Sequence, residues 1–247
     1  MLTHERLEVA GTYLDLKVAA GGRSAAGRTL ILVHGLPRAA GMGRHAAGLL
    51  PELAEHLAAE SGWRVATGTL SGVGGSTGTF SATRWRRDLG RVIDWANDGD
   101  ARISLAGFGF GGALALAVTA GDERVRGVAT FAAPAHLEAW CGSAESLRGR
   151  TIDAGVVSTT EDLPAADQLL ADVLAVAPLE AVTRIPPRRL LIGHGTDDVE
   201  VPVQDARDLV DAADGRAELR LIQGAGHQLR ADPRMVATLL GWLDRHR

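Results

Sequence analysis

The stretch ISLAGFGFGGALALAV, residues 103–118, decides the fold of this chain. It begins as an apolar strand and ends as a run of alanine and leucine, residues that favour a helix. Gly107, Gly109 and Gly111 stand between the two, so the strand turns into the helix without a polar connection. A strand that leads directly into a helix is the repeating unit of an α/β sheet.

The same alternation runs through most of the chain. Residues 7–9 and 13–18 have the pattern of a β-hairpin. Further strands are expected at residues 28–34, 63–70, 101–106, 124–133, 189–193 and 217–222, and helices at 49–61, 82–98, from 111, 203–213 and 231–247. This order predicts an α/β fold in which a mostly parallel central sheet carries helices on both faces.

Two of the expected helices show which side they bury. In the last one, Asp232 is placed as N-cap and Pro233 in the first turn, with Val236, Leu240 and Leu243 facing inward. In the helix at 82–98 the helical period aligns one apolar stripe, made of Trp85, Leu89, Val92 and Ala96.

The alternation breaks after Pro134. Residues 135–185 contain no strand-like run, only polar turns and one helical stretch at 165–177. An irregular insertion late in an α/β domain suggests a cap over the carboxyl ends of the strands, where such sheets bind ligands. We therefore expect one domain over residues 1–247, with a core of 1–134 and 186–247 and a cap of about 135–185.

The composition disfavours several classes of protein. A net charge of −4 gives no electrostatic case for nucleic acid or an anionic membrane as partner. Cys141 is the only cysteine, no apolar run is long enough to span a bilayer, and no signal-peptide pattern is evident. No stretch has zinc-ligand, Walker or dinucleotide spacing, so neither metal nor cofactor is expected. We expect a cytoplasmic protein whose partner is a small-molecule substrate or ligand.

Three further stretches follow expected strands and carry polar residues. LVHGLPR, residues 32–38, places His34 and Gly35 just after a buried strand. HGTDDVEVP, residues 194–202, brings two acids, Asp197 and Asp198, onto a loop. LIQGAGHQL, residues 221–229, ends the last strand with His227 on a glycine-containing loop. Together with the glycine-rich turn, these stretches would meet at the carboxyl edge of a parallel sheet.

These four elements, in this order, resemble the α/β-hydrolase fold, and the chain looks like a small, capped serine hydrolase. In that family a G-x-S-x-G turn carries the nucleophilic serine, followed along the chain by an acid and a histidine. The resemblance implies that Asp198 is the acid and His227 the base. The backbone N–H groups of Leu36 and Phe110 would form the oxyanion hole. Gly109 takes the place of the nucleophile, and there the chain departs from the family.

Gly109 is open to three interpretations. It is a tight turn in a binding protein or decayed enzyme, or it leaves room for a water or substrate oxygen that His227 activates. In the third interpretation another residue supplies the nucleophile; the candidates are Ser71, Ser76, Cys141 and Ser143. Without a side-chain oxygen at residue 109, no acyl-enzyme can form there in any of the three.

The partners of His227 leave a smaller choice. Asp197 competes with Asp198 for the acid's place, and only the spacing favours Asp198. His34 and His194 open their loops and are interpreted as structural residues rather than catalysts. The sequence therefore predicts a His227–Asp198 general-base dyad acting on a small apolar carbonyl-containing or ester-like molecule, with a non-catalytic binding protein as the alternative.

Overall fold

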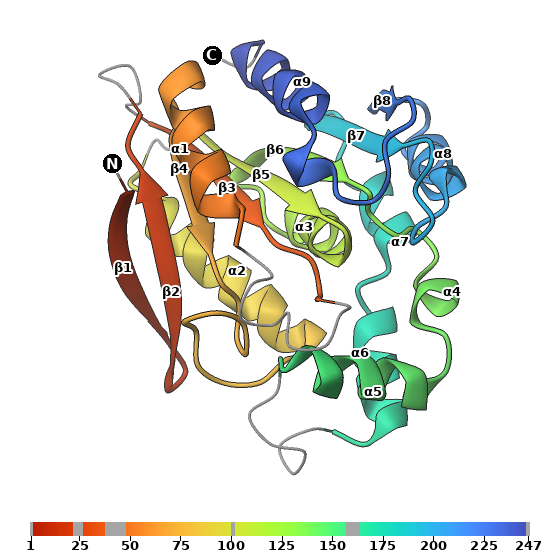
Figure 1. The fold of residues 1–247 in the computed structure, drawn as a ribbon. Helices are drawn as coiled ribbons and strands as arrows, with labels where there is room; N and C mark the ends of the chain where they lie inside the picture. The colour runs from red at the N-terminus through yellow and green to blue at the C-terminus, as the bar shows by residue number, and fades with distance from the viewer. Residues whose placement is uncertain (1, 22–26, 38–47, 100–101, 157–163, 246–247) are drawn as a thin grey trace.

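A computed structural model describes residues 2–21, 27–37, 48–99, 102–156 and 164–245. Within them, eight strands form one sheet in the order β1-β2-β4-β3-β5-β6-β7-β8 (Figure 1). The strands are β1 (Leu2–Val9), β2 (Thr12–Ala19), β3 (Arg28–Val33), β4 (Arg64–Gly68), β5 (Arg102–Phe108), β6 (Val125–Phe131), β7 (Arg189–Gly195) and β8 (Glu218–Ile222). The pairs β1–β2 and β2–β4 are antiparallel and all others are parallel. The predicted fold class is confirmed.

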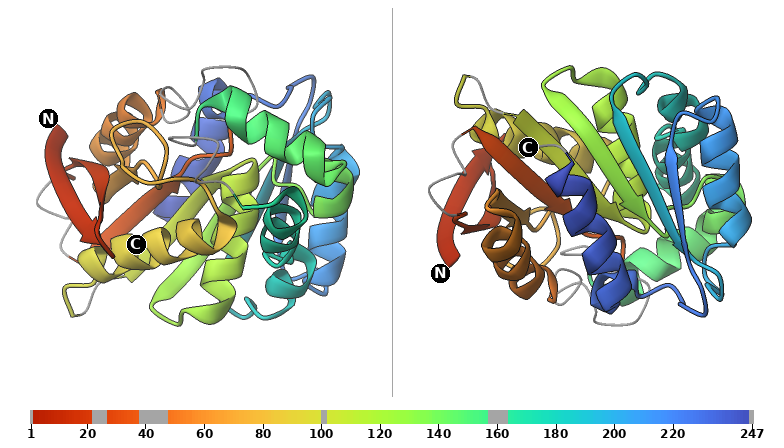
Figure 2. Two further views of the ribbon diagram at one scale, coloured as in Figure 1. Left: turned by 90° about the horizontal axis from the view of Figure 1, so that it is seen from below. Right: turned by 90° about the horizontal axis from the view of Figure 1, so that it is seen from above.

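Helices cover both faces of this sheet (Figure 2). One apolar cluster contains α1 (Leu50–Ser61) and α9 (Pro233–Asp244). A larger cluster on the other face contains α2 (Ala82–Ala96), α3 (Phe110–Gly121) and α8 (Val203–Ala212). The predicted stripe of α2 is buried at all four positions, and its N-cap is Ser81, whose side chain accepts a hydrogen bond from the N–H of Arg84. Burial of apolar area on both sides of the sheet drives the assembly.

The buried stripe of α9 differs from its prediction. Asp232 does cap the helix, by accepting a hydrogen bond from the N–H of Arg234, and Leu243 is buried. Val236 and Leu240 are only partly buried, however, and the innermost residues are instead Met235, Leu239 and Trp242. The reason lies in the sheet: a Cβ added to Gly127 of β6 would stand 3.1 Å from the Trp242 ring, so the bare glycine backbone accommodates that ring. Packing of the indole sets the rotation of the helix.

The region predicted as a cap holds more helix than expected. Among residues 135–156 and 164–185 the structure has α4 (Leu137–Cys141), α5 (Ala144–Ala154), α6 (Ala166–Leu174) and α7 (Pro178–Thr183), and no strand. The single helix expected at 165–177 ends at Leu174, and Ala177, with φ 43°, turns the chain into α7. The prediction of one helical stretch was therefore wrong. The helices α4 and α7 are too short to show a period, and the buried stripe of α5 contains one large apolar residue, Leu147.

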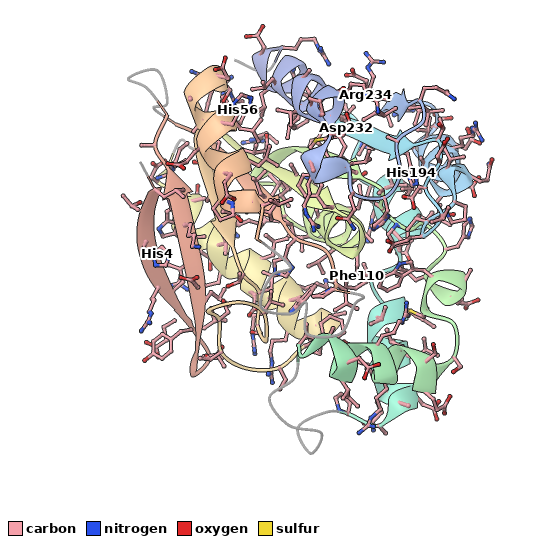
Figure 3. All side chains as sticks on the ribbon, in the orientation of Figure 1. His4, His56, Phe110, His194, Asp232 and Arg234 are labelled. Atoms are coloured by element: carbon pink, nitrogen blue, oxygen red, sulfur yellow. The ribbon has the colours of Figure 1, made fainter. Side chains whose placement is uncertain are left out.

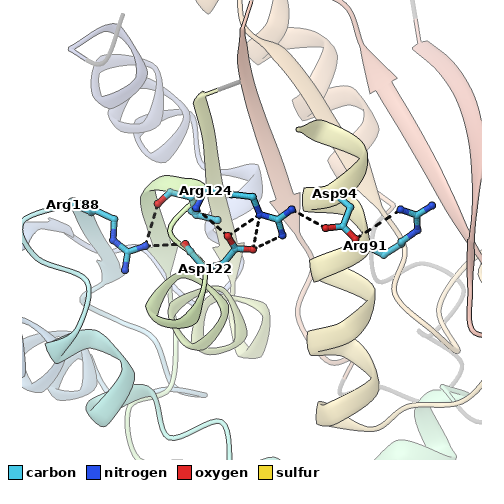
Figure 4. A network of polar contacts seen from close by, with 6 residues as sticks. Arg91, Asp94, Asp122, Arg124 and Arg188 are labelled. Carbon is cyan, nitrogen blue, oxygen red and sulfur yellow. Dashed lines mark hydrogen bonds and ion pairs between the residues drawn. The ribbon is translucent and has the colours of Figure 1, made fainter. Parts of the chain in front are cut away.

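Charged residues hold together the edge of the sheet where β6 and β7 begin (Figure 4). Arg124 donates hydrogen bonds to Asp122 and to Asp94 of α2, and Arg188 donates to the backbone oxygens of Asp122 and Val125. The Arg124 guanidinium holds the pKa of the Asp122 carboxyl below its ordinary value. This network lies at the end of α3 away from Gly109. None of the helices in the described ranges has the length and apolar character needed to cross a membrane.

Candidate functional site

The turn at residues 107–111, which we call the elbow, joins β5 to α3 at the carboxyl end of the sheet. Gly109 has φ 54° and ψ −130°, and its N–H donates a 2.9 Å hydrogen bond to the backbone oxygen of Phe131. Cβ atoms added to Gly107 or Gly111 would overlap backbone atoms of Gly111 and His34, respectively. The elbow is therefore a close approach of three backbone segments, which glycine alone permits.

The steric surroundings of Gly109 differ from those of Gly107 and Gly111. A Cβ added there would meet only the His227 ring, 3.5 Å from Nε2 and 3.8 Å from Cε1, which are ordinary contact distances. The described structure therefore leaves room for a side chain at residue 109, beside the imidazole. The positive φ is the single local feature that favours glycine at this position.

His227 and Asp198 are brought together by the loops that follow β8 and β7. The Nδ1–H of His227 donates to Oδ2 of Asp198 over 2.9 Å, and this carboxylate is fully buried while the imidazole is 17% exposed. Asp197 is exposed and its Oδ1 accepts a hydrogen bond from Thr196 instead. The geometry thus selects Asp198 over Asp197 as the partner of His227.

Asp198 has a full set of donors. Its Oδ1 accepts the N–H groups of Glu200 (2.8 Å) and Val201 (2.9 Å). Its Oδ2 accepts from His227 and lies 3.3 Å from Nε2 of His194, which also donates to the backbone oxygen of Val201. Burial by itself raises the pKa of Asp198, but the hydrogen bonds from His194, His227 and the backbone outweigh it and hold that pKa well below its ordinary value. Asp198 is a fixed negative charge behind the imidazole.

His34 holds the loop after β3 against the elbow. Its Nδ1–H donates to the backbone oxygen of Gly35 over 2.9 Å, and its Nε2 accepts the N–H of Leu70 over 3.0 Å, which defines a neutral ring. Burial lowers the pKa of His34 to about 4. A Cβ on Gly35 would lie 2.9 Å from the backbone oxygen of Phe108 and 3.8 Å from the Cα of Gly109. Gly35 therefore lies against the elbow, and Leu36 follows it directly along the chain.

Phe110 is the first residue of α3, where N–H groups have no partner within the helix. Its ring stacks on Trp140 of α4, with centroids 5.3 Å apart and planes 7° apart. Trp85 and Phe80 pack behind it, and the Arg150 guanidinium lies over the Trp140 ring, 5.2 Å from its centroid. An apolar wall built partly from the 135–185 region thus stands next to the elbow. In Figure 3 Phe110 and His194 mark the two sides of the site, and His56 and His4 lie away from it.

None of the four alternative nucleophiles contacts His227 within the described residues. Ser71 is fully buried, and Ser76 bonds to Thr69 and to the N–H of Asp15 on the β2 side of the sheet. Cys141 is buried in α4, and Ser143 caps α5 by accepting the N–H of Ser146. The contacts of His227 are instead Asp198 and, 3.9 Å from Nε2, the Oε2 of Glu200.

Glu200 is the site residue that the sequence analysis missed, and His194, interpreted as structural, is buried against Asp198. Both belong to HGTDDVEVP, where His194 precedes Asp198 by four residues and Glu200 follows it by two. Polar residues so close to the acid were the available signal. In the part of the chain that the structure describes, no group of three or more His, Cys, Asp or Glu side chains is arranged to hold a metal ion.

Comparison with known proteins gives matches in structure only. No protein-family model matches the chain, and no curated protein matches it significantly. An alpha/beta hydrolase, GrgF, from Penicillium sp. sh18 matches with a TM-score of 0.74 at 20% identity, covering 100% of this chain and 99% of the other. An esterase from Pyrococcus furiosus gives 0.73 at 16% identity, covering 99% and 91%. A thioesterase domain from the curacin biosynthetic pathway gives 0.66 at 16%, covering 98% and 99%.

Proposed function

We propose, from the α/β-hydrolase fold that this chain has, that it hydrolyses a small, largely apolar ester-like or carbonyl-containing molecule without a serine nucleophile. One observation carries the proposal. His227 is bonded through Nδ1 to a buried carboxylate, and its Nε2 faces the position where the elbow would carry a side chain, 3.5 Å from a Cβ on Gly109. This arrangement suits a general base that takes a proton from a water molecule rather than from a serine hydroxyl.

In the proposed reaction a water occupies the place of the missing serine oxygen. His227 Nε2 takes one proton from the water as its oxygen attacks the acyl carbon, and Asp198 stabilises the imidazolium that forms. The N–H groups of Leu36 and Phe110 would donate hydrogen bonds to the developing oxyanion, assisted by the N-terminus of α3. The bond to the leaving group then breaks, and the proton held on Nε2 passes to that group. Water is consumed, and an acid and an alcohol are released.

The surroundings support a small apolar substrate. The stacked rings of Phe110 and Trp140 form an apolar wall beside the elbow. Residues of about 135–185, which supply Trp140, are proposed as the cap that determines which acyl or alcohol group fits. A neutral carbonyl compound would be bound there by apolar contact and oriented by the few polar groups of the elbow.

A second candidate function is non-catalytic binding of the same kind of molecule. The observation that favours it is Gly109 itself, because the elbow has no side chain that could attack a substrate. The two functions differ in what His227 does: in an enzyme it moves a proton, and in a binding protein it only contacts the ligand.

The deciding experiment is hydrolysis of short-chain p-nitrophenyl esters by the unmodified protein and by His227→Ala. We expect turnover in the first and a loss of roughly 100-fold or more in the second. His56→Ala, an exposed histidine on α1, is the matched control and should retain full activity. Turnover that survives His227→Ala would overturn the dyad mechanism.

Gly109→Ser separates the two candidate functions if the unmodified protein is inactive. A serine in this conformation costs about 1–3 kcal/mol in backbone strain but places a hydroxyl next to His227 Nε2. Activity gained only in Gly109→Ser would show a complete site that lacks the nucleophile, which supports the binding function. A burst of p-nitrophenol would report the acyl-enzyme.

A further inference from the structure

Replacing a serine hydroxyl by water changes the number of hydrogens at the site. A serine Oγ has one hydrogen, which the histidine accepts, and its covalent bond to Cβ fixes the direction of its lone pairs. A water has two hydrogens and no covalent tether. With His227 as the only acceptor, the second hydrogen is undirected and the attacking lone pair is poorly oriented. A water-using version of this site therefore benefits from a second acceptor near Nε2.

Glu200 is in the position to be that acceptor. Its Oε2 lies 3.9 Å from His227 Nε2, the nitrogen that faces Gly109. This distance is too long for a direct hydrogen bond, and polar groups so separated are commonly bridged by water. The backbone N–H of Glu200 donates to Oδ1 of Asp198 over 2.8 Å, so the same carboxylate that orients His227 also fixes the backbone of Glu200. The side chain is 33% exposed, so solvent water can reach it.

We propose that Glu200 accepts the second hydrogen of the attacking water and is a catalytic residue of the reaction proposed above, on which this inference rests. The water donates one hydrogen to His227 Nε2 and the other to Glu200 Oε2. These two hydrogen bonds orient the water, and a lone pair of its oxygen remains directed at the acyl carbon. As the new C–O bond forms, the proton toward Nε2 moves to His227, and the proton toward Glu200 stays on the product acid until it is released to solvent.

The charges around Glu200 fit this role. Burial lowers the pKa of Arg230, and the negative charge of Glu200 opposes that change, so the two side chains attract each other near the site. In a protein with serine at residue 109, a carboxylate near Nε2 would compete with that nitrogen for the single hydrogen of the serine hydroxyl. With glycine at residue 109 that competition does not arise, which gives a physical reason for Glu200 and Gly109 to occur together.

The test compares Glu200→Leu and Glu200→Gln in the unmodified and the Gly109→Ser backgrounds. With Gly109 present, we expect Glu200→Leu to lower kcat for ester hydrolysis roughly 10- to 100-fold with little change in KM. Glu200→Gln, whose amide oxygen still accepts a hydrogen bond, should lose less. In Gly109→Ser the burst of p-nitrophenol reports attack by the serine, so Glu200→Leu should leave the burst rate unchanged or raise it. Glu60→Leu, an exposed acid on α1, controls for the loss of charge.

The outcomes separate this inference from the proposed function. Absence of any turnover that depends on His227 overturns the proposed function. Turnover that depends on His227 but not on Glu200 overturns only the role of Glu200. A high-resolution crystal structure gives a readout without activity: a water within hydrogen-bond distance of both Nε2 and Oε2 is expected. A direct Glu200–His227 hydrogen bond, or no water in contact with both atoms, would overturn the inference.

Discussion

The two sides of the candidate site are built in opposite ways. The elbow side consists of backbone segments pressed together at glycines, and it offers N–H groups but no reactive side chain. On the other side, hydrogen bonds join the loops that follow β7 and β8, and Asp198 alone accepts from four donors. The difference teaches that the shape of this turn is independent of the side chain it carries, because backbone packing determines the shape without any contribution from a side chain at residue 109.

The largest expected effect tests whether the elbow depends on its flanking glycines or on Gly109. Gly111→Ala places a Cβ on the backbone oxygen of His34, and we expect a loss of about 3 kcal/mol or more in the free energy of unfolding. Gly109→Ala introduces only strain at positive φ, about 1–2 kcal/mol. Unfolding in urea measures both.

Gly90→Ala is the control for that comparison. Gly90 lies inside α2 with nothing within 4 Å of an added Cβ, so alanine there should raise the free energy of unfolding by about 0.5–1 kcal/mol. If Gly109→Ala is as damaging as Gly111→Ala, the distinction between the two kinds of glycine is wrong.

An intermediate effect sharpens the comparison through pH. His34, under the elbow, is neutral in the folded protein with a pKa of about 4, against 6.5 when unfolded. Because the unfolded chain binds the proton more readily, stability is complete above pH 6.5 and falls as the pH drops toward 4. The loss amounts to about 3 kcal/mol. His34→Gln should remove this part of the pH dependence, measured as urea unfolding between pH 7 and 4.

Asp198, on the other side, titrates in a separate window. Its pKa is depressed by folding, so its contribution to stability is present above about pH 4, the ordinary value of an aspartate, and is lost only at lower pH. Asp198→Asn should therefore leave the pH 7 to 4 window unchanged. A pH dependence there that His34→Gln retains and Asp198→Asn removes would contradict the assignment.

The smallest expected effect concerns how the 135–185 region is attached to each side. Asp172 of α6 accepts the N–H groups of Ala82 and Thr83 at the start of α2, and Asp205 of α8 accepts the N–H of Ala135. Asp172→Ala should cost about 1 kcal/mol, as the loss of a helix cap does. Asp205 is buried, and Asp205→Ala should cost about 2 kcal/mol because it leaves a buried donor unsatisfied. Both losses in the free energy of unfolding are measured in urea. Equal losses for the two variants would contradict the inference that Asp205 attaches this region more tightly than Asp172 does.

The sequence predicted the fold through patterns that are local to each element. The buried strands and the stripe of α2 follow from periodicity, and the observed sheet and helix agree with them. The roles of elbow, acid and histidine came instead from the resemblance to the α/β-hydrolase family. The rotation of α9 could not be predicted, because it depends on Trp242 finding a bare backbone at Gly127, far away in sequence.

At the site, spacing pointed to Asp198 beside His227, and the two are in contact in the structure. Glu200 could not be found in the same way. Its closeness to Nε2 results from the bend of the loop after Asp198, which hydrogen bonds from Glu200 and Val201 to the carboxylate create. Only the folded loop shows that Asp198, and not Asp197, bonds to the imidazole and that Glu200 also lies near it.

The room beside Gly109 also has a meaning for how this chain can evolve. Glycine and serine have codons that differ by a single base, and the elbow would receive the new side chain without a steric clash. The serine-using and serine-free forms of this scaffold are therefore neighbours in sequence space, separated by one point mutation and a modest loss of stability. A lineage could change from either form to the other in one step, and the protein would remain folded in both.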